Sequence, residues 1–211
     1  MILEGRHIYK TYEKEDGAVL KDVSISADEG DFICVMGPSG CGKSTLLNIL
    51  AGLLENDEGE VLIQGDSYKS LSEEEISHKR KSEIGYVAQG YSLLKNYTLG
   101  DNLLLPLLLR EDTDDVLEEV QKALDLVGLL EKKNRYPSKL SGGEQRRGAL
   151  ARAFVIHPKI IIADEPTADL DADNAEIILE LLFKESKKGT AVIISTHDEK
   201  AKKYATKILE L

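Results

Sequence analysis

Apolar residues along this chain gather in short runs whose spacing predicts a mixed α/β protein. Apolar and polar positions alternate over the first forty residues, with turn signals at Gly17 and at Asp28–Gly30, which predicts strands and hairpins. Phe32–Met36 is continuously apolar and predicts a strand buried on both faces. A glycine-rich stretch follows, and Ser44–Ala51 then has helical character. The pattern therefore predicts a strand, a loop and a helix in direct succession.

The second half of the chain predicts parallel strands. Ile160–Ala163 and Ala191–Ile194 are short and apolar, and an amphipathic segment from Ala175 to Ser186 lies between them. Strands that alternate with helices form parallel sheets joined by crossover helices. We therefore expect an α/β fold with a mainly parallel sheet and an antiparallel β part at the N-terminus.

Between these halves the apolar spacing becomes that of a helix. An acidic stretch at Asp112–Asp115 is expected to begin it and Gly128 to end it. The residues that recur at helical intervals are Val116, Leu117, Val120, Leu124 and Val127. We expect an inserted helical subdomain over residues 91–135, within a single domain that comprises residues 1–211.

Charge and composition exclude several classes of partner. The chain has 27 basic and 38 acidic residues, a net charge of −11, which disfavours broad contact with nucleic acid or anionic lipid. The leucine-rich stretch Leu103–Leu109 contains Pro106 and is far shorter than the ~20 apolar residues that span a bilayer. We expect no nucleic-acid partner and no direct membrane insertion, so that any membrane association goes through a protein partner.

The start of the chain and its cysteines indicate where the protein works. The first residues lack the basic-then-apolar order of a secretory signal. The two cysteines fit a reducing compartment. We therefore expect a cytoplasmic protein.

The glycine-rich stretch carries a phosphate-binding motif, because Gly37, Gly42, Lys43 and Ser44 match G-x-x-x-x-G-K-[ST]. Glycines let the backbone turn its N–H groups toward phosphate oxygens, and the following helix adds its positive end. Lys43 is expected to meet the β- and γ-phosphates, and Ser44 to supply a hydroxyl to Mg²⁺. The residues expected to hold the nucleotide are Gly37, Pro38, Ser39, Gly40, Cys41, Gly42, Lys43, Ser44 and Thr45.

Two carboxylates, Asp164 and Glu165, end the strand that begins at Ile160. In a parallel sheet this places both at the carboxyl edge, where ligands bind. Asp164 is then expected to help hold the metal, and Glu165 to orient or deprotonate the water that attacks the γ-phosphate. Strands often end in an acidic turn, so the two carboxylates alone do not indicate a metal site. The phosphate-binding motif in the same chain is what supports this role for them.

A third motif, Leu-Ser-Gly-Gly-Glu-Gln at Leu140–Gln145, completes the set. With it the chain resembles the ATP-binding cassette (ABC) family of ATPases over nearly its whole length, which implies a P-loop NTPase core that binds ATP and Mg²⁺. The motif stands at the start of a helix, where a hydroxyl and backbone amides form an anion site. By resemblance that site contacts the γ-phosphate bound by the opposite protomer, although such a sequence is also an ordinary helix cap. The signature residues are Ser141, Gly142, Gly143, Glu144 and Gln145.

The resemblance assigns further roles in chain order. Tyr12 is similar to the aromatic residue that stacks on adenine, with Tyr9 as its rival. Gln89 resembles the glutamine that reaches Mg²⁺ and the attacking water. His197 resembles the histidine that senses the γ-phosphate. These roles imply that Glu165, His197, Gln89 and Lys43 form the catalytic set, and that Ser44, Gln89 and Asp164 are the metal ligands.

Two features depart from the family pattern. The loop that resembles the segment crossing to the other protomer includes Asp169 and Asp171, and Asp169 is an acid where relatives usually have Asn or Ala. Gly148 interrupts the helix after the signature, at a cost of roughly 1 kcal/mol relative to Ala. Neither departure removes a catalytic group.

The resemblance implies two partners, a second ABC ATPase subunit and an integral membrane permease. The second subunit is another copy of this chain, in a homodimer around two Mg·ATP, or a similar chain. The chain is then peripheral on the inner face of the cell membrane. We expect the ATPase subunit of a transporter, as an exporter or a mechanotransmission complex. The alternative is an ABC ATPase that regulates a membrane protein in cell division or signalling without transport. Soluble cassettes of DNA repair or translation usually need longer insertions or two cassettes, and a non-enzymatic module would not need Glu165 and His197.

The segment Tyr91–Leu99, followed by Asn102 and by Leu-Pro-Leu-Leu at Leu105–Leu108, resembles the bacterial branch of lipoprotein-releasing, macrolide-exporting and peptide-resistance systems. Its apolar residues fit a subdomain core equally well. Some of them are nevertheless expected to form a groove for a short helix of the membrane partner. Our candidates are Leu93, Leu94 and Tyr97.

Overall fold

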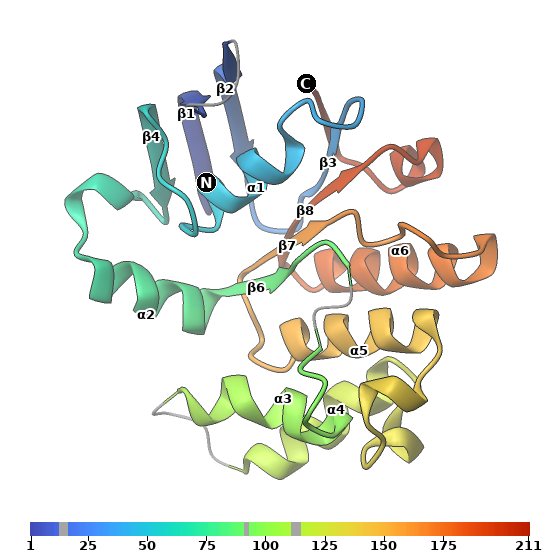
Figure 1. The fold of residues 1–211 in the computed structure, drawn as a ribbon. Coiled ribbons are helices and arrows are strands. Elements are labelled where there is room, and N and C mark those ends of the chain that lie inside the picture. Colours follow the sequence, from blue (N-terminus) through green and yellow to red (C-terminus); the bar gives the residue numbers. More distant parts are fainter. Residues whose placement is uncertain (13–16, 91–92, 111–114) are drawn as a thin grey trace.

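The computed structural model describes residues 1–12, 17–90, 93–110 and 115–211, whose strands form two sheets (Figure 1). A parallel sheet has the order β6-β7-β8-β3-β9, and an antiparallel sheet has the order β2-β1-β4-β5. The strands of the parallel sheet are β3 (Phe32–Met36), β6 (Ile84–Val87), β7 (Ile160–Asp164), β8 (Ala191–Thr196) and β9 (Lys207–Glu210). The antiparallel strands are β1 (Leu3–Thr11), β2 (Ala18–Ala27), β4 (Glu58–Ile63) and β5 (Asp66–Ser67). The expected α/β class is confirmed.

Six α-helices lie within the described residues, and several begin at a capping residue. Ser72, Thr98 and Ser141 each start a helix with a capping box, in which the side chain accepts a backbone N–H three residues on. The helices are α1 (Lys43–Leu50), α2 (Glu73–Glu83), α3 (Leu99–Leu108), α4 (Val116–Leu126), α5 (Gly142–Phe154) and α6 (Ala172–Lys187). Short 3₁₀ turns occupy Tyr68–Ser70, Leu130–Lys132, Pro137–Lys139 and Glu199–Lys203. No described helix has the length and apolar character needed to cross a bilayer.

Both faces of the parallel sheet are covered, as the apolar run at Phe32–Met36 predicts. Ile33 and Val35 of β3 belong to a core shared with α1 and the antiparallel sheet. Phe32 and Cys34 belong to a second core, shared with α5, α6 and the helices α3 and α4. Alternate residues of one strand thus support opposite layers, and α1 lies between the two sheets (Figure 1).

The segment expected to be inserted contains α3 and α4, which pack on α5 below the parallel sheet (Figure 1). Gly148 of α5 permits this approach, because a Cβ there would lie 2.7 Å from Leu99 Cδ1 and 3.2 Å from Leu93 Cδ1. Gly148 therefore destabilises α5 as a helix, but its lack of a side chain lets Leu93 and Leu99 pack close against α5. Tyr91 and Ser92, and most of the acidic stretch before α4, lie outside the described residues.

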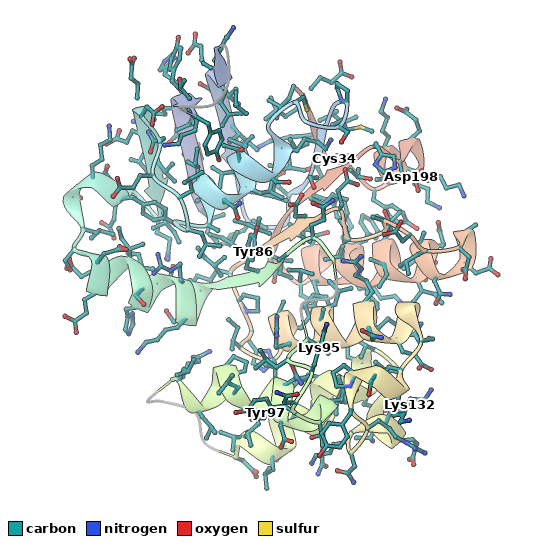
Figure 2. All side chains as sticks on the ribbon, in the orientation of Figure 1. Cys34, Tyr86, Lys95, Tyr97, Lys132 and Asp198 are labelled. Carbon is teal, nitrogen blue, oxygen red and sulfur yellow. The ribbon has the colours of Figure 1, made fainter. Side chains whose placement is uncertain are left out.

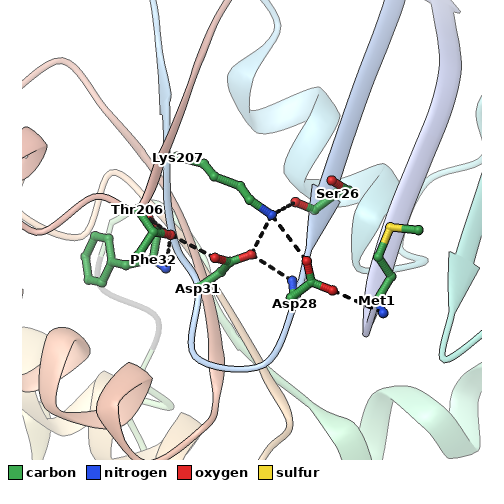
Figure 3. Close-up of polar contacts among 7 residues, drawn as sticks. All are labelled: Met1, Ser26, Asp28, Asp31, Phe32, Thr206 and Lys207. Atoms are coloured by element: carbon green, nitrogen blue, oxygen red, sulfur yellow. Dashed lines mark hydrogen bonds and ion pairs between the residues drawn. The ribbon is translucent and has the colours of Figure 1, made fainter.

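The edge strand β9 is tied to the turn between β2 and β3 by a small polar cluster (Figure 3). The Lys207 ammonium lies 2.7 Å from Asp31 Oδ2 and donates to the Ser26 carbonyl at 3.1 Å. The Thr206 hydroxyl donates to Asp31 Oδ1 at 2.9 Å. Burial alone would raise the pKa of Asp31, but these hydrogen bonds outweigh it and hold that pKa below its ordinary value. The hydrogen bond to Asp31 in turn raises the pKa of Lys207.

The signs of these shifts predict how stability depends on pH. A depressed carboxyl pKa gives stability above the unfolded-state pKa, and this stability is lost as the pH falls through the folded-state pKa. We expect Lys207→Met to lower the free energy of unfolding at pH 7 by about 0.2–1 kcal/mol. The deficit should shrink at a pH below the folded-state pKa of Asp31. Urea unfolding at both pH values measures this effect, with Lys21→Met on β2 as the control; an equal deficit at both would contradict it.

Candidate functional site

The glycine-rich loop joins β3 to α1 at the carboxyl edge of the parallel sheet. Gly42 has φ +101° and a Cβ there would lie 2.8 Å from Leu20 Cδ2. A Cβ on Gly37 would lie 2.7 Å from Cys41 Sγ and 2.8 Å from the Leu211 carbonyl oxygen. Glycine is therefore required at Gly42 by backbone conformation and at both positions by space.

Lys43 is the first residue of α1, and only 7% of it is exposed. Its ammonium donates to the carbonyl oxygens of Gly37 at 2.8 Å and Pro38 at 3.0 Å. It also lies 3.6 Å from Glu165 Oε1. A buried ammonium is tolerated because such acceptors replace water. The Lys43 ammonium therefore already lies against the loop, where it can bind an anion such as a phosphate.

Ser195, on the neighbouring strand β8, holds both Asp164, the last residue of β7, and Glu165, which follows it. Ser195 of β8 is opposite Asp164 in the parallel register. Its hydroxyl donates to Asp164 Oδ1 at 2.5 Å and accepts from the Glu165 backbone N–H at 2.8 Å. Glu165 itself has φ +46°, a conformation that non-glycine residues rarely adopt and that the surroundings must hold. Its Oε2 atom lies 3.0 Å from His197 Nδ1.

A cavity of about 290 Å³ lies against the loop. The expected site residues that line it are Tyr12, Ser39, Gly40, Gly42, Lys43, Ser44, Thr45, Gln89 and Glu165, joined by Val19. The Tyr12 hydroxyl lies 3.3 Å from Thr45 Oγ1. Tyr9 is not among the described lining residues and pairs with Glu58 in the antiparallel sheet. The cavity thus places Tyr12, and not its rival, beside the phosphate loop.

Other expected residues surround this cavity without lining it. Within the described part of the chain these are Gly37, Pro38, Cys41, Asp164 and His197. Asp164 is 3% exposed, whereas the His197 side chain is 72% exposed and touches the site through Glu165. Sequence reasoning did not single out Ser195. Ser195 could have been found from its position near the end of β8, because β8 lies beside the strand that ends in Asp164.

The signature segment forms the start of α5. Ser141 is the N-cap, and its hydroxyl accepts from the Glu144 backbone N–H at 3.3 Å. The Glu144 carboxylate accepts in return from the Ser141 backbone N–H. It also pairs with Lys132, which Figure 2 labels below the parallel sheet. These contacts, led by the one from Lys132, hold the pKa of Glu144 below its ordinary value. Gln145 turns back to donate to the Leu140 carbonyl at 3.1 Å.

The loop before α6 is held against the signature. Asp171 caps α6 by accepting from the Asn174 backbone N–H at 2.8 Å, and the amide of Asn174 also donates to both of its oxygens. These bonds lower the pKa of Asp171. A Cβ on Gly143 would lie 2.4 Å from Asn174 Oδ1, so a larger residue there would displace the Asn174 side chain. Asp169 is exposed, with φ +61°.

A parallel sheet, a glycine loop that enters a helix, and two carboxylates at the carboxyl end of a second strand, β7, define a nucleotide-binding protein of the phosphate-loop class. Comparison with known proteins gives the family. Residues 20–168 match the family described as ABC transporter, and the chain belongs to it.

Relatives and solved structures agree with this assignment. An ABC transporter ATP-binding protein of Methanocaldococcus jannaschii is 41% identical over 100% of this chain and 95% of its own length. A lipoprotein-releasing system ATP-binding protein, LolD, of Acinetobacter baylyi is 38% identical over 100% and 95%. A macrolide export protein, MacB, of Bdellovibrio bacteriovorus is 38% identical, but this chain covers 32% of it. A dimeric ATP-binding cassette bound to ADP and Pi matches with TM-score 0.90 and 35% identity, over 99% of this chain and 94% of that one.

The chain is therefore an ABC-family ATPase, the ATP-binding subunit of a transporter. The predicted resemblance to the lipoprotein-release and macrolide-export branch is confirmed by LolD and MacB among the relatives. The transport function is favoured over regulation of a membrane protein in cell division or signalling, because these relatives are named for release and export.

Proposed function

We propose that two copies of this chain close around two Mg·ATP molecules and so drive a separate membrane-spanning partner. One observation carries the proposal. Among the described residues that line the cavity, none comes from the signature Leu140–Gln145. The amides of Gly142 and Gly143 stand in the first turn of α5, where N–H groups have no acceptor within the helix. An anion site that the cavity of its own chain does not use is suited to the nucleotide of a second chain.

The residues around the cavity fit a triphosphate with its metal. Lys43 supplies a buried cation to the phosphates. Ser44, Gln89 and Asp164 offer the hydroxyl, amide and carboxylate oxygens that Mg²⁺ accepts as ligands. The ion, when bound, neutralises phosphate charge. Glu165 is assigned the role of base toward the attacking water, because its carboxylate faces the cavity beside Lys43.

Four further residues complete the assignment. Tyr12 offers an aromatic ring at the cavity wall for the adenine. His197, through its contact with Glu165, is placed to orient that carboxylate and to meet the γ-phosphate. Asp169 and Asp171 lie on the loop assigned to the dimer interface, with Asp171 already engaged as a helix cap.

Mixing two inactive variants tests whether the site is shared between chains. Lys43→Ala removes the phosphate-loop cation, and Gly143→Asp places a carboxylate in the signature. Each variant alone should hydrolyse ATP very slowly. A mixed dimer has one site with an intact loop from one chain and an intact signature from the other. An equal mixture should therefore recover about a quarter of wild-type activity, since half the dimers are mixed and each has one good site.

The control for this experiment mixes each inactive variant with itself at the same total concentration. Activity in the mixture that equals the mean of the two separate samples would contradict a site shared between chains. It would place the signature and the phosphate loop in the same chain's site.

The membrane partner is proposed to dock in a second, largely apolar cavity of about 320 Å³ between α2, α3 and α5. Figure 2 shows Tyr86 at the level of the sheet and Tyr97 in the helical part below it. The lining residues are Arg80, Lys81, Ile84, Gly85, Tyr86, Leu94, Leu105, Pro106, Leu109, Arg152, Ala153 and Ile156. Of the three candidates from the sequence, Leu94 lines this groove, Tyr97 is exposed outside it, and Leu93 is 5% exposed and belongs to the core. Leu93 therefore supports the groove and is not available to a partner.

A charge placed in the groove tests this docking site. Leu105→Arg should leave basal ATP hydrolysis within about twofold of wild type, because Leu105 does not line the nucleotide cavity and the two cavities share no described lining residue. The fraction of the protein that sediments with membranes of its own cells should fall. Leu117→Arg, on α4, is the control: Leu117 is also an exposed leucine, 55% against 41% for Leu105, but it does not line the groove. Equal membrane binding by both variants would contradict the site. Such a location implies work on the cytoplasmic side, peripheral at the inner face of the membrane.

A further inference from the structure

Arg146 is a buried cation in the helix that carries the signature. It lies one turn into α5 and is only 3% exposed. Its Nη1 group donates to the Gly90 carbonyl at 2.9 Å, and its Nη2 group donates to the Ala168 carbonyl at 3.4 Å. These two carbonyls come from loops that follow different strands, β6 and β7. One side chain thus joins three elements of the molecule.

Both carbonyls belong to loops that carry site residues. Gly90 follows Gln89 directly, and Gln89 lines the nucleotide cavity. Ala168 precedes Asp169, and its own N–H donates to the Glu165 carbonyl at 3.1 Å. The carbonyl that Arg146 holds therefore lies in the same turn as the carboxylate assigned as base.

The chemistry of the guanidinium suits this bridging role. Its donors form a rigid planar fork that can satisfy two separated acceptors at once, whereas a lysine presents its donors from a single atom. Removing a buried cation from water is costly unless its hydrogen bonds are made, so the two loops and the helix are held to one geometry. Small displacements of groups around a reacting centre can reduce a rate by ~10²-fold.

We propose that Arg146 is a positioning residue that sets the Gln89 loop and the Glu165–Asp169 turn of its own chain relative to the signature helix. The proposal rests on the function proposed above. It adds a link inside one protomer, from the helix whose first turn meets the partner's nucleotide to the loops that act on its own nucleotide.

Loss of this link should act on turnover and not on binding. Arg146→Met should lower kcat by about 10- to 100-fold. The affinity for ATP and the KM should stay within about twofold, because the phosphate loop is not touched. Arg110→Met is the matched control: Arg110 also donates to a backbone carbonyl, that of Ile156 at 2.6 Å, but away from the nucleotide cavity. The control should keep kcat within about twofold.

Mixed dimers separate this proposal from the function on which it rests. An Arg146→Met chain mixed with a Lys43→Ala chain provides one site with an intact phosphate loop, but the Gln89 loop of that site is unanchored. This mixture should stay near the activity of its separate components, while the Gly143→Asp and Lys43→Ala mixture recovers. Failure of both mixtures to recover would count against the shared site itself. Equal recovery in both would overturn the role of Arg146 in its own site.

A conservative variant covers the case in which Arg146→Met folds poorly. Arg146→Lys keeps the buried charge but donates from a single nitrogen, and it should lose about threefold or more in kcat with ATP affinity unchanged. A kcat within twofold of wild type for this folded variant would overturn the proposal. A parallel loss of ATP affinity, or an equal loss in Arg110→Met, would also overturn it, because both indicate general damage to the fold.

Discussion

Glu165→Gln is expected to reduce ATP hydrolysis by about 10²- to 10⁴-fold, the usual contribution of a general base. The amide keeps the size of the carboxylate but does not accept a proton from water. The strained backbone of Glu165, held by Ser195, does not depend on the charge, so the loop should keep its shape. ATP affinity should stay close to wild type, and ATP should trap the closed pair. Steady-state hydrolysis and size-exclusion chromatography with ATP measure these two effects.

A second buried carboxylate provides the control for this variant. Glu185 on α6 is 8% exposed and pairs with Lys188 at 2.6 Å, on an element that does not line the nucleotide cavity. Glu185→Gln should leave hydrolysis within about twofold of wild type, because it removes a buried charge without touching the site. Wild-type hydrolysis by Glu165→Gln would show that another group, or water alone, takes the proton.

Lys43→Ala is expected to weaken ATP binding by about 10²- to 10⁴-fold, because hydrogen bonds to charged groups each contribute ~1.5–3 kcal/mol and the lysine can make two. The loss also leaves Glu165 without the cation that lies 3.6 Å from it. The phosphates would then approach an uncompensated carboxylate. Isothermal titration with ATP measures the change in affinity. Lys187→Ala, an exposed lysine on α6, is the control, and an affinity for Lys43→Ala within threefold of wild type would contradict the assignment.

Local sequence signals predicted the central part of the fold. The apolar runs at Phe32–Met36 and Ile160–Ala163 are continuous, and a strand buried on both faces needs no polar alternation. The strands β4 and β5, after the phosphate loop, were missed. The pairing of β4 with β1 depends on residues some fifty positions away, and no local pattern records such a pairing. β5 is a two-residue strand that pairs with β4, too short for apolar alternation to mark it. The helix α2 was also missed, because its described residues are mostly polar and none is buried.

Part of the candidate site could likewise be predicted from local sequence, and part could not. The phosphate loop was predictable because its glycines, lysine and serine stand at fixed spacing within one short stretch of sequence. Ser195 and Arg146 were not singled out, since their partners, Asp164 in one case and Gly90 in the other, lie far away in the sequence. A buried polar residue acquires its role from the groups around it, which only the assembled fold brings together. The same holds for Leu93, whose apolar character fits a groove and a core equally.

One helix, α5, reaches from one functional region to the other. It begins at the signature, and Arg152 and Ala153 of its last turn line the groove proposed for the membrane partner. Its 13 residues make a rod about 20 Å long, so that a tilt of about 5° imposed at one end moves the other by roughly 1.7 Å. A displacement of the donor smaller than this is enough to break a hydrogen bond to a phosphate oxygen. If the membrane partner and the second protomer bind where we propose, a slight rotation of α5 at the groove would be enough to make or break the hydrogen bonds of the signature to the partner's nucleotide.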